Sequence, residues 1–264
     1  MQSAVSTAYF RFKACSDSGT FYFSRWRPPL FHFAHPMSTP TLAREAPWQA
    51  GWHSAKLLFR PGLVLQCMAL GLVLSYYYLP GARAGFESLA HWRTDGGYLF
   101  SAIASALCGG LLPFLYLHFT GTNRSAYPWP HLIFFAAFWA WKGAEVDLLY
   151  RTLSVLYGIE PTPGVVVRKV LTDQFIFNVC YAAPVGNLFF GWKDAGFKWG
   201  PVMADVRAGG WYGRRVLPVL IGVWAVWIPV VSCVFALPAP LQIPLFNIVL
   251  CFWSLLFAHI LRRG

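Results

Sequence analysis

The sequence predicts an all-α fold, a polytopic transmembrane helical bundle of about five to six membrane helices joined by short loops. The 264 residues are 57% hydrophobic and 18% aromatic, and only 12% are charged. Charged residues make up roughly a quarter of a soluble globular domain. Several apolar windows also reach the roughly 20 residues that a helix needs to cross a bilayer. Because this apolar surplus is too large for a surface in water, we expect no soluble catalytic domain.

Six windows between charged or Pro/Gly-rich breaks are long and apolar enough to be membrane helices. They are Leu57–Leu79, Tyr98–Phe119, Leu132–Tyr157, Val170–Phe190, Val216–Leu237 and Ile243–Leu261. We place them in a single transmembrane domain over residues 51–264. A basic, aromatic-rich arm over residues 1–50 precedes it, which we expect to be a disordered, transit-like segment or to lie before a true start at Met37.

The formal net charge of +11 indicates membrane topology rather than binding to nucleic acid, because the basic residues lie mostly beside the apolar windows. The lipid bilayer is therefore the expected partner. Six crossings place both termini on the side with more Lys and Arg, which is the cytoplasmic-type side. The basic residues on that side are Arg44, Lys56, Arg60, Arg124, Lys193, Lys198, Arg207, Arg214, Arg215, Arg262 and Arg263.

The six cysteines are scattered and form no C-x-x-C pair. A disulfide framework or a zinc site is therefore not expected. The sequence also has no G-x-S-x-G, H-E-x-x-H or phosphate-binding glycine loop. We expect no metal site and no cofactor.

The second window contains small residues that favour close helix packing. Ser101 and Ser105 precede Gly109 and Gly110, and small side chains let helix backbones approach each other in lipid. This stretch is a candidate contact face for a partner or for another copy of the chain, which would make a homo-oligomer. Pro113 is expected to kink the helix.

The third window carries four charged residues in an otherwise apolar helix. Lys142 and Glu145 are spaced as an i,i+3 pair, and Asp147 and Arg151 as an i,i+4 pair. The two pairs point to nearly opposite sides, and a charge facing lipid costs roughly 2.5–3.5 kcal/mol at the bilayer centre. Three interpretations follow: a self-neutralised helix that packs the bundle, part of a polar pathway, or a helix that lies at the interface without spanning.

Polar residues also enter the fourth window. Lys169 and Asp173 form an i,i+4 pair, Gln174 follows, and Asn178 extends the polar face. An ionisable residue inside a membrane is a candidate functional group. The alternative is a hydrogen bond between helices, worth on the order of 0.6 kcal/mol. These four residues and the four of the third window are our candidates for a polar pathway or for helix pairing.

The last two windows are interrupted and joined by prolines. Pro229 frees a backbone carbonyl, which we expect to be satisfied by a neighbouring helix, by a hydroxyl such as Ser232, or by water. Only about five residues, Pro238 to Gln242, connect the two windows. They should therefore form a tight antiparallel pair.

Motifs in this C-terminal part support a family resemblance. A K-x-x-x-D-Q motif is present at Lys169, Asp173 and Gln174, and a stretch similar to W-x-x-W-P…F…P is formed by Trp224, Trp227, Pro229, Phe235 and Pro238, followed by Trp253. Over about residues 165–262 the chain resembles the Mpv-seventeen/PMP-twenty-two family of peroxisomal and mitochondrial inner-membrane proteins, which has bacterial relatives. The resemblance implies structural roles for the Trp and Pro residues. It also implies a protein of one of those membranes, or of the cell membrane in a bacterium.

Three functions remain open. The resemblance implies a channel, or a protein that affects solute balance across a membrane, and it implies no enzymatic reaction. A non-conducting structural or partner-binding membrane protein is the alternative. A distant third is an intramembrane protease of the CAAX type, whose motifs are faintly resembled, in reversed order, by Phe114, His118, Glu145, Asp147 and Arg151. Of the three, we expect a channel or a protein that affects solute balance, and we do not expect an enzyme.

Overall fold

The computed structural model describes residues 47–120 and 128–263, so the predictions about residues 1–46 and Arg124 lie outside it. The described residues form helices and no strands. In chain order the helices are α1 (Pro47–Tyr78), α2 (Pro80–Ser105), η1 (Ala106–Leu111), α3 (Leu112–Thr120), α4 (Trp129–Tyr157), α5 (Pro163–Leu171), η3 (Thr172–Ala182), α6 (Ala183–Asp194), α7 (Trp199–Arg207), η4 (Tyr212–Val216), α8 (Leu217–Phe235) and α9 (Ala239–Arg263), where η marks a π-helix. The predicted all-α bundle is confirmed.

Five helical stretches among the described residues are long and apolar enough to cross a membrane. They are Gly51–Tyr78, Pro80–Thr120, Pro163–Asp194, Tyr212–Phe235 and Ala239–Leu256. Helix α4 is also long, with 29 residues, but it carries the four charged residues of the third window. The architecture is that of a multi-pass membrane protein.

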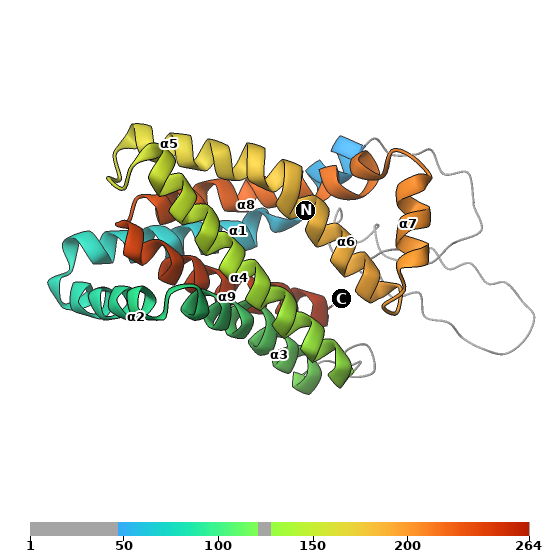
Figure 1. Ribbon diagram of the computed structural model, residues 1–264, viewed down its shortest axis with the longest axis horizontal. Coiled ribbons are helices and arrows are strands. Elements are labelled where there is room, and N and C mark those ends of the chain that lie inside the picture. The colour runs from blue at the N-terminus through green and yellow to red at the C-terminus, as the bar shows by residue number, and fades with distance from the viewer. Residues whose placement is uncertain (1–46, 121–127, 264) are drawn as a thin grey trace, which may run out of the picture.

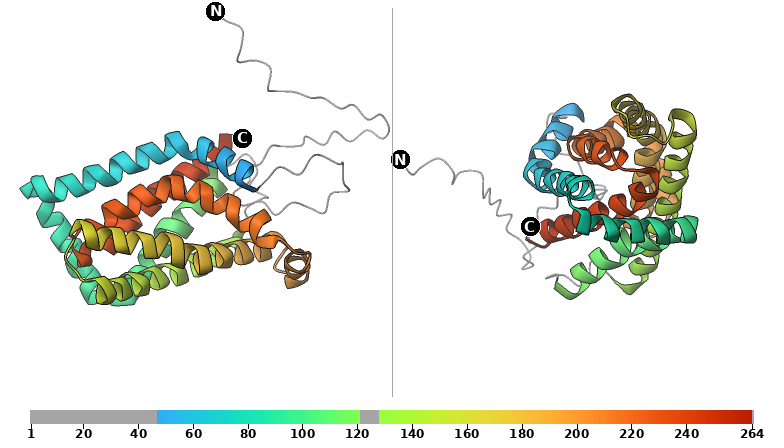
Figure 2. Two further views of the ribbon diagram at one scale, coloured as in Figure 1. Left: turned by 90° about the horizontal axis from the view of Figure 1, so that it is seen from above. Right: turned by 90° about the vertical axis from the view of Figure 1, so that its left-hand side faces the viewer.

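The long helices run alternately in opposite directions (Figures 1 and 2). Three connections, Leu79, 158–162 and 236–238, gather at one end of the bundle, which we call the Leu79 end. The short helix α7 lies at the other end, the α7 end, where α1 begins and α9 ends (Figures 1 and 2). Helices α8 and α9 are antiparallel, as expected, and Gln242 Nε2 donates to the carbonyl oxygen of Leu237 at their connection, 3.0 Å away.

Residues 80–97 separate the first two predicted membrane windows, where we expected a short loop. They are helical from Pro80, which occupies the first turn of α2, where its missing N–H costs no hydrogen bond. Phe86 is buried against Tyr76, with ring centroids 5.8 Å apart, and Arg83 pairs with Glu87 four residues later. Phe86 thus packs this charged segment against α1, and its charged residues had placed it outside the predicted membrane windows.

Two irregular points divide the second membrane helix. Gly97 has φ +51° and ψ −134° within α2, a conformation that glycine adopts without a Cβ clash. The ladder disruption expected at Pro113 takes the form of the π-helix η1, which ends two residues before it. Residues 98–105 are therefore a short regular helix between two weak points.

Helices α1 and α8 approach closely. A Cβ added at Gly51 or Gly62 would lie 2.6 Å from Ile221 or 2.8 Å from Val226. Next to these glycines, Gln66 Nε2 donates to the carbonyl oxygen of Ala225 at 3.0 Å. Pro229 leaves that carbonyl without its helical partner, so a neighbouring helix satisfies it, as the first of our three alternatives predicted.

Candidate functional site

Helix α4 brings the buried polar groups together. It packs against α2, η1, α9 and α5 inside the bundle, and its charged side chains point to two different neighbours. Asp147 faces α2, whereas Lys142 faces η3. Both charged sides are covered by other helices, so neither pair is exposed broadly to lipid.

Asp147 is the centre of an ion-pair cluster between α2 and α4. Its side chain is 0% exposed, and its Oδ1 accepts from Arg93 Nη2 at 2.6 Å and from Arg151 Nε at 2.9 Å. Its Oδ2 accepts from the hydroxyl of Ser101 at 2.6 Å. The expected pairing of Asp147 with Arg151 is confirmed. Two guanidinium groups against one carboxylate leave the cluster with a net charge of about +1, because arginine stays protonated in proteins.

The kink at Gly97 lies between Arg93 and Ser101, which both donate hydrogen bonds to the carboxylate of Asp147. The two residues are eight positions apart on α2, and the break between them lets both reach Asp147. Arg151 also lies over the ring of Tyr98, 4.7 Å from its centroid, and is 39% exposed. The cluster therefore extends from a buried carboxylate to a partly exposed guanidinium.

A second buried polar contact, between α2 and α9, lies one helical turn along α2 from Ser101. The hydroxyl of Ser105 donates to Asn247 Oδ1 on α9 at 2.7 Å, and Asn247 Nδ2 donates to the carbonyl oxygen of Ile243 at 3.0 Å. Both side chains are buried. Gly143 lets α4 pack directly against this part of α2. An added Cβ would lie 2.3 Å from the carbonyl oxygen of Ser101 and 2.4 Å from Ser105 Oγ.

The other charged side of α4 is held by aromatic rings. Lys142 forms the expected ion pair with Glu145, and both side chains are close to one-tenth exposed. The ammonium lies 5.8 Å from the Phe177 ring centroid and 5.4 Å from that of Tyr181, both on η3. Glu145 Oε2 has no hydrogen-bond partner among the described residues. This pair is separate from the Asp147 cluster.

Lys169 and Asp173 are both buried, but they do not form an ion pair with each other. Lys169 is 1% exposed. Its ammonium donates to the hydroxyl of Ser154 at 3.1 Å and lies 5.9 Å from the centroid of the Phe235 ring. The i,i+4 spacing permitted a pair, but tertiary contacts with α4 and α8 draw the lysine away. Within residues 47–120 and 128–263, Asp173 has no cationic partner.

Asp173 and Gln174, the D-Q part of the K-x-x-x-D-Q motif, lie in the first turn of the π-helix η3. Gln174 is buried, its Oε1 lacks a partner in the described part of the chain, and its main-chain carbonyl accepts from Trp224 Nε1 at 3.1 Å. Asn178 is half-buried on the same π-helix. Trp227 lies 6.3 Å from Trp253 between ring centroids. Two of the tryptophans for which the resemblance implies structural roles therefore connect helices: Trp224 links α8 to η3, and Trp227 packs α8 against α9.

The structure thus divides the eight candidate polar residues into three groups instead of bringing them to one place. It adds Arg93 and Asn247, to which we had assigned no role, and Ser101 and Ser105, which we had interpreted as small packing residues. The i,i+4 spacing of Ser101 and Ser105 was a usable signal. The contacts across helices join residues 46 to 142 positions apart. No pattern of neighbouring residues in the sequence predicted them.

The residues that faintly resembled a protease are not gathered. His118 lies in an aromatic cluster at the end of α3, with its ring centroid 4.4 Å from that of Trp129. Glu145 lies sixteen residues further along α4 than Trp129, which is about 24 Å at 1.5 Å per residue. No group of three His, Cys, Asp or Glu residues suited to a metal ion occurs in the parts of the chain that are described.

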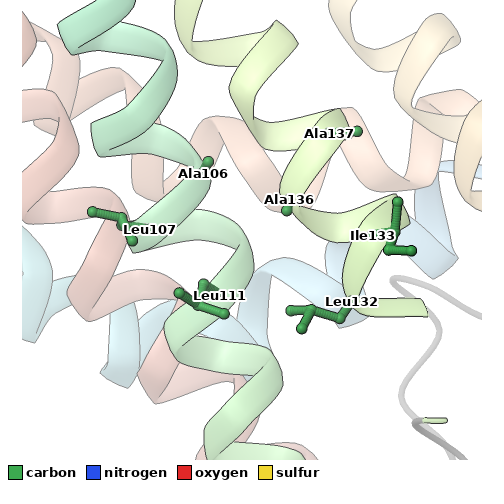
Figure 3. A pocket seen from close by; sticks show the side chains of 7 residues that line it. All are labelled: Ala106, Leu107, Leu111, Leu132, Ile133, Ala136 and Ala137. Atoms are coloured by element: carbon green, nitrogen blue, oxygen red, sulfur yellow. The ribbon is translucent and has the colours of Figure 1, made fainter. Parts of the chain in front are cut away.

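A shallow apolar hollow lies between η1 and α4 (Figure 3). It has a volume of about 470 Å³ and is lined by Ala106, Leu107, Leu111, Leu132, Ile133, Ala136 and Ala137. It contains no polar side chain. Beside it, Gly109 contacts the ring of Trp139 and Gly110 contacts the main chain of Phe135. The small-residue face that we considered for a partner is therefore occupied by α4 of the same chain.

Comparison with known proteins assigns no family to this chain. No protein-family model matches it, and no curated protein or solved structure matches it either. The resemblance of residues 165–262 to the Mpv-seventeen/PMP-twenty-two family stays a prediction.

Proposed function

We propose that this multi-pass membrane protein lets small polar solutes or ions cross its membrane, along the interface of α2, α4 and α9. The observation that carries the proposal is a line of two neighbouring polar groups, Arg93–Asp147–Ser101 and Ser105–Asn247, in which every side chain is buried except the partly buried Arg93. Charged residues inside membrane helices are costly and commonly mark ion or substrate pathways. The permeation function implied by the family resemblance agrees with this proposal.

The depth of Asp147 and Asn247 supports a polar site inside the membrane rather than a contact at its surface. Asp147 precedes the end of α4 at Tyr157 by ten residues, about 15 Å along the helix, and Asn247 follows the start of α9 at Ala239 by eight residues, about 12 Å. Both distances are measured from the Leu79 end. Asp147 and Asn247 therefore lie at similar depths, about halfway through a hydrocarbon core of roughly 30 Å.

The route is closed in this conformation, and the helix irregularities supply a way to open it. Gly143 packs directly on the backbone of Ser101. The segment that carries both serines lies between the break at Gly97 and the π-helix η1. Such irregularities are common at functional hinges. Movement of residues 98–105 away from Gly143 would expose the polar line to water.

A non-conducting structural role is the second candidate. The observation that favours it is the completeness of the bonding at Asp147, which is 0% exposed and receives three side-chain donors. A network of this kind also fixes how helices pack. On this reading, the polar groups set the register of α2, α4 and α9, and no solute passes.

Flux measurements on reconstituted protein distinguish the two. Purified full-length protein is placed in liposomes and planar bilayers, and wild type is compared with Ser105→Ala and Asn247→Ala on the line. Glu145→Gln on the far side of α4 is the matched control. Our proposal expects currents or solute flux that either line variant alters by several-fold and the control leaves unchanged.

Wild-type protein that is folded and inserted but carries no flux would overturn the route and favour the structural role. Equal effects of Asn247→Ala and Glu145→Gln would also overturn it, because the line would then not be the path. Circular dichroism and size-exclusion profiles of each variant confirm that the bundle is intact.

A further inference from the structure

The two ends of the bundle differ in how their charges are matched. Between residues 193 and 215, at the α7 end, five basic residues stand against two acidic ones, Asp194 and Asp205. At the Leu79 end, Arg83 is paired with Glu87 at 3.0 Å and His91 contacts Asp95 at 2.7 Å. The excess positive charge is therefore concentrated at one end.

Two of the basic side chains at the α7 end are fixed by one carboxylate. Asp205 of α7 accepts from Arg214 Nη2 at 3.0 Å through Oδ1 and from Arg215 Nε at 2.9 Å through Oδ2. Arg214 also donates to the main-chain carbonyls of Asp205, at 3.1 Å, and Gly209. Gly209 supplies the positive φ, +79°, that turns the chain between α7 and η4. The two guanidinium groups are thus held close together with one negative charge between them.

Lys198 and Arg207 flank α7 and add unmatched charge. Lys198 immediately precedes the helix, Arg207 is its last residue, and both are exposed. Neither forms an ion pair within the described part of the chain. Trp199 lies between them, is 43% exposed, and stacks on Trp192 with ring centroids 5.4 Å apart.

We propose that these residues form a binding surface for the headgroups of anionic phospholipids in the leaflet that meets the α7 end. The surface, which we call the α7 surface, consists of Lys198, Trp199, Arg207, Arg214 and Arg215. Guanidinium groups bind phosphate oxygens with matched geometry. Basic clusters beside a membrane helix attract anionic lipid, and tryptophan settles at the headgroup level.

Asp205 acts as a positioning residue in this surface. It lowers the net charge, so it would weaken binding if charge alone decided the affinity. Its contacts instead hold Arg214 and Arg215 at the start of the membrane helix 212–235. The inference requires a membrane protein but does not depend on the proposed transport.

Lipid titration by native mass spectrometry tests the surface. Full-length protein in detergent is titrated with phosphatidylglycerol and with phosphatidylcholine of the same acyl chains. The test variant is Lys198→Gln with Arg207→Gln, and the control, Arg83→Gln with Arg168→Gln, removes the same charge near the Leu79 end. We expect wild type to prefer phosphatidylglycerol. A loss of about fivefold per basic residue, or about 25-fold for the test variant, is expected, with little change in the control.

Equal affinity of wild type for the two lipids would overturn the proposal. An equal loss in the test and control variants would also overturn it, because the preference would then reflect net charge alone. For Asp205, positioning predicts that Asp205→Asn weakens the preference for phosphatidylglycerol although it removes a negative charge, and that Asp205→Glu retains the preference. Stronger binding by Asp205→Asn would refute the positioning role.

Discussion

Asp147 and Asp173 are two buried carboxylates that the bundle holds in different ways. Asp147 receives two guanidinium groups and a hydroxyl from its surroundings. Asp173 has no cationic partner among the described residues, although Lys169 is one helical turn away and is equally buried. Burial inside the helical bundle therefore does not by itself imply an ion pair. The neighbouring helices decide whether the charge is matched.

The helices that carry the two carboxylates also differ in how closely a neighbouring helix packs at their glycines. On the Asp147 side, Gly143 lies against the backbone of α2, whereas Gly164 at the start of α5 has no atom within 4 Å of an added Cβ. The Asp147 cluster thus lies in a close three-helix contact. At Gly164, by contrast, a side chain would meet open space.

The largest expected effect tests the matched carboxylate. Asp147→Asn should lower the free energy of unfolding by about 3–5 kcal/mol, because it leaves Arg93 buried without its counter-charge. Reversible unfolding of the protein in mixed micelles measures the change. Asp95→Asn, in an exposed contact with His91, is the control and should cost at most about 1 kcal/mol. A cost at Asp147 no larger than at Asp95 would show that the cluster adds no stability.

The second prediction concerns the close helix contact. Gly143→Val should destabilise the bundle by about 1–3 kcal/mol, because the new side chain meets the backbone of Ser101 and forces α2 and α4 apart. Gly164→Val is the matched control and should change stability by about 0.5 kcal/mol at most. The same unfolding assay measures both. Similar costs for the two variants would contradict the close contact.

An effect of similar size is expected at the lysine side. Ser154→Ala removes the hydroxyl that accepts from Lys169 and should cost about 1–3 kcal/mol, because the ammonium remains buried with one partner fewer. Lys169→Met removes the charge itself. In the double variant the cost of Ser154→Ala should disappear. A double-mutant cycle measures this coupling, and additive effects would mean that the hydrogen bond contributes nothing.

The smallest effect is expected at the unmatched carboxylate. Asp173→Asn keeps the side-chain shape and breaks no ion pair, so the free energy of unfolding should change by less than about 1 kcal/mol. Comparison with Asp147→Asn under identical conditions is the measurement. Costs of the same size would erase the distinction between the two carboxylates and would imply a cation near Asp173.

The sequence predicted much of the site chemistry on single helices. The spacing of Lys142 with Glu145 and of Asp147 with Arg151 predicted pairs that form. The same rule applied to Lys169 and Asp173 allowed a pair that does not form, because Ser154 and Phe235 lie on other helices and hold the ammonium there. Local spacing predicts what is geometrically available. It does not rank that contact against contacts from distant parts of the chain.

The hydrogen bond to the main-chain carbonyl freed by Pro229 also shows that the sequence does not identify a distant partner. Pro229 guaranteed that a carbonyl on the preceding turn needed a donor. The sequence could not select Gln66 as that donor, because 159 positions separate it from Ala225. In the same way, the glycines at 109 and 110 predicted a close contact, and the fold assigns that contact to α4 instead of to a second molecule.

The sequence by itself determined that this protein is a bundle of membrane-type helices, because hydropathy and helix length depend only on residues adjacent in the chain. It also determined which polar residues lie within those helices. The tertiary structure decided which of them meet, adding Arg93 and Ser101 to Asp147 and separating Lys169 from Asp173. Those choices depend on helix packing, where a single glycine or kink brings distant side chains within hydrogen-bond reach.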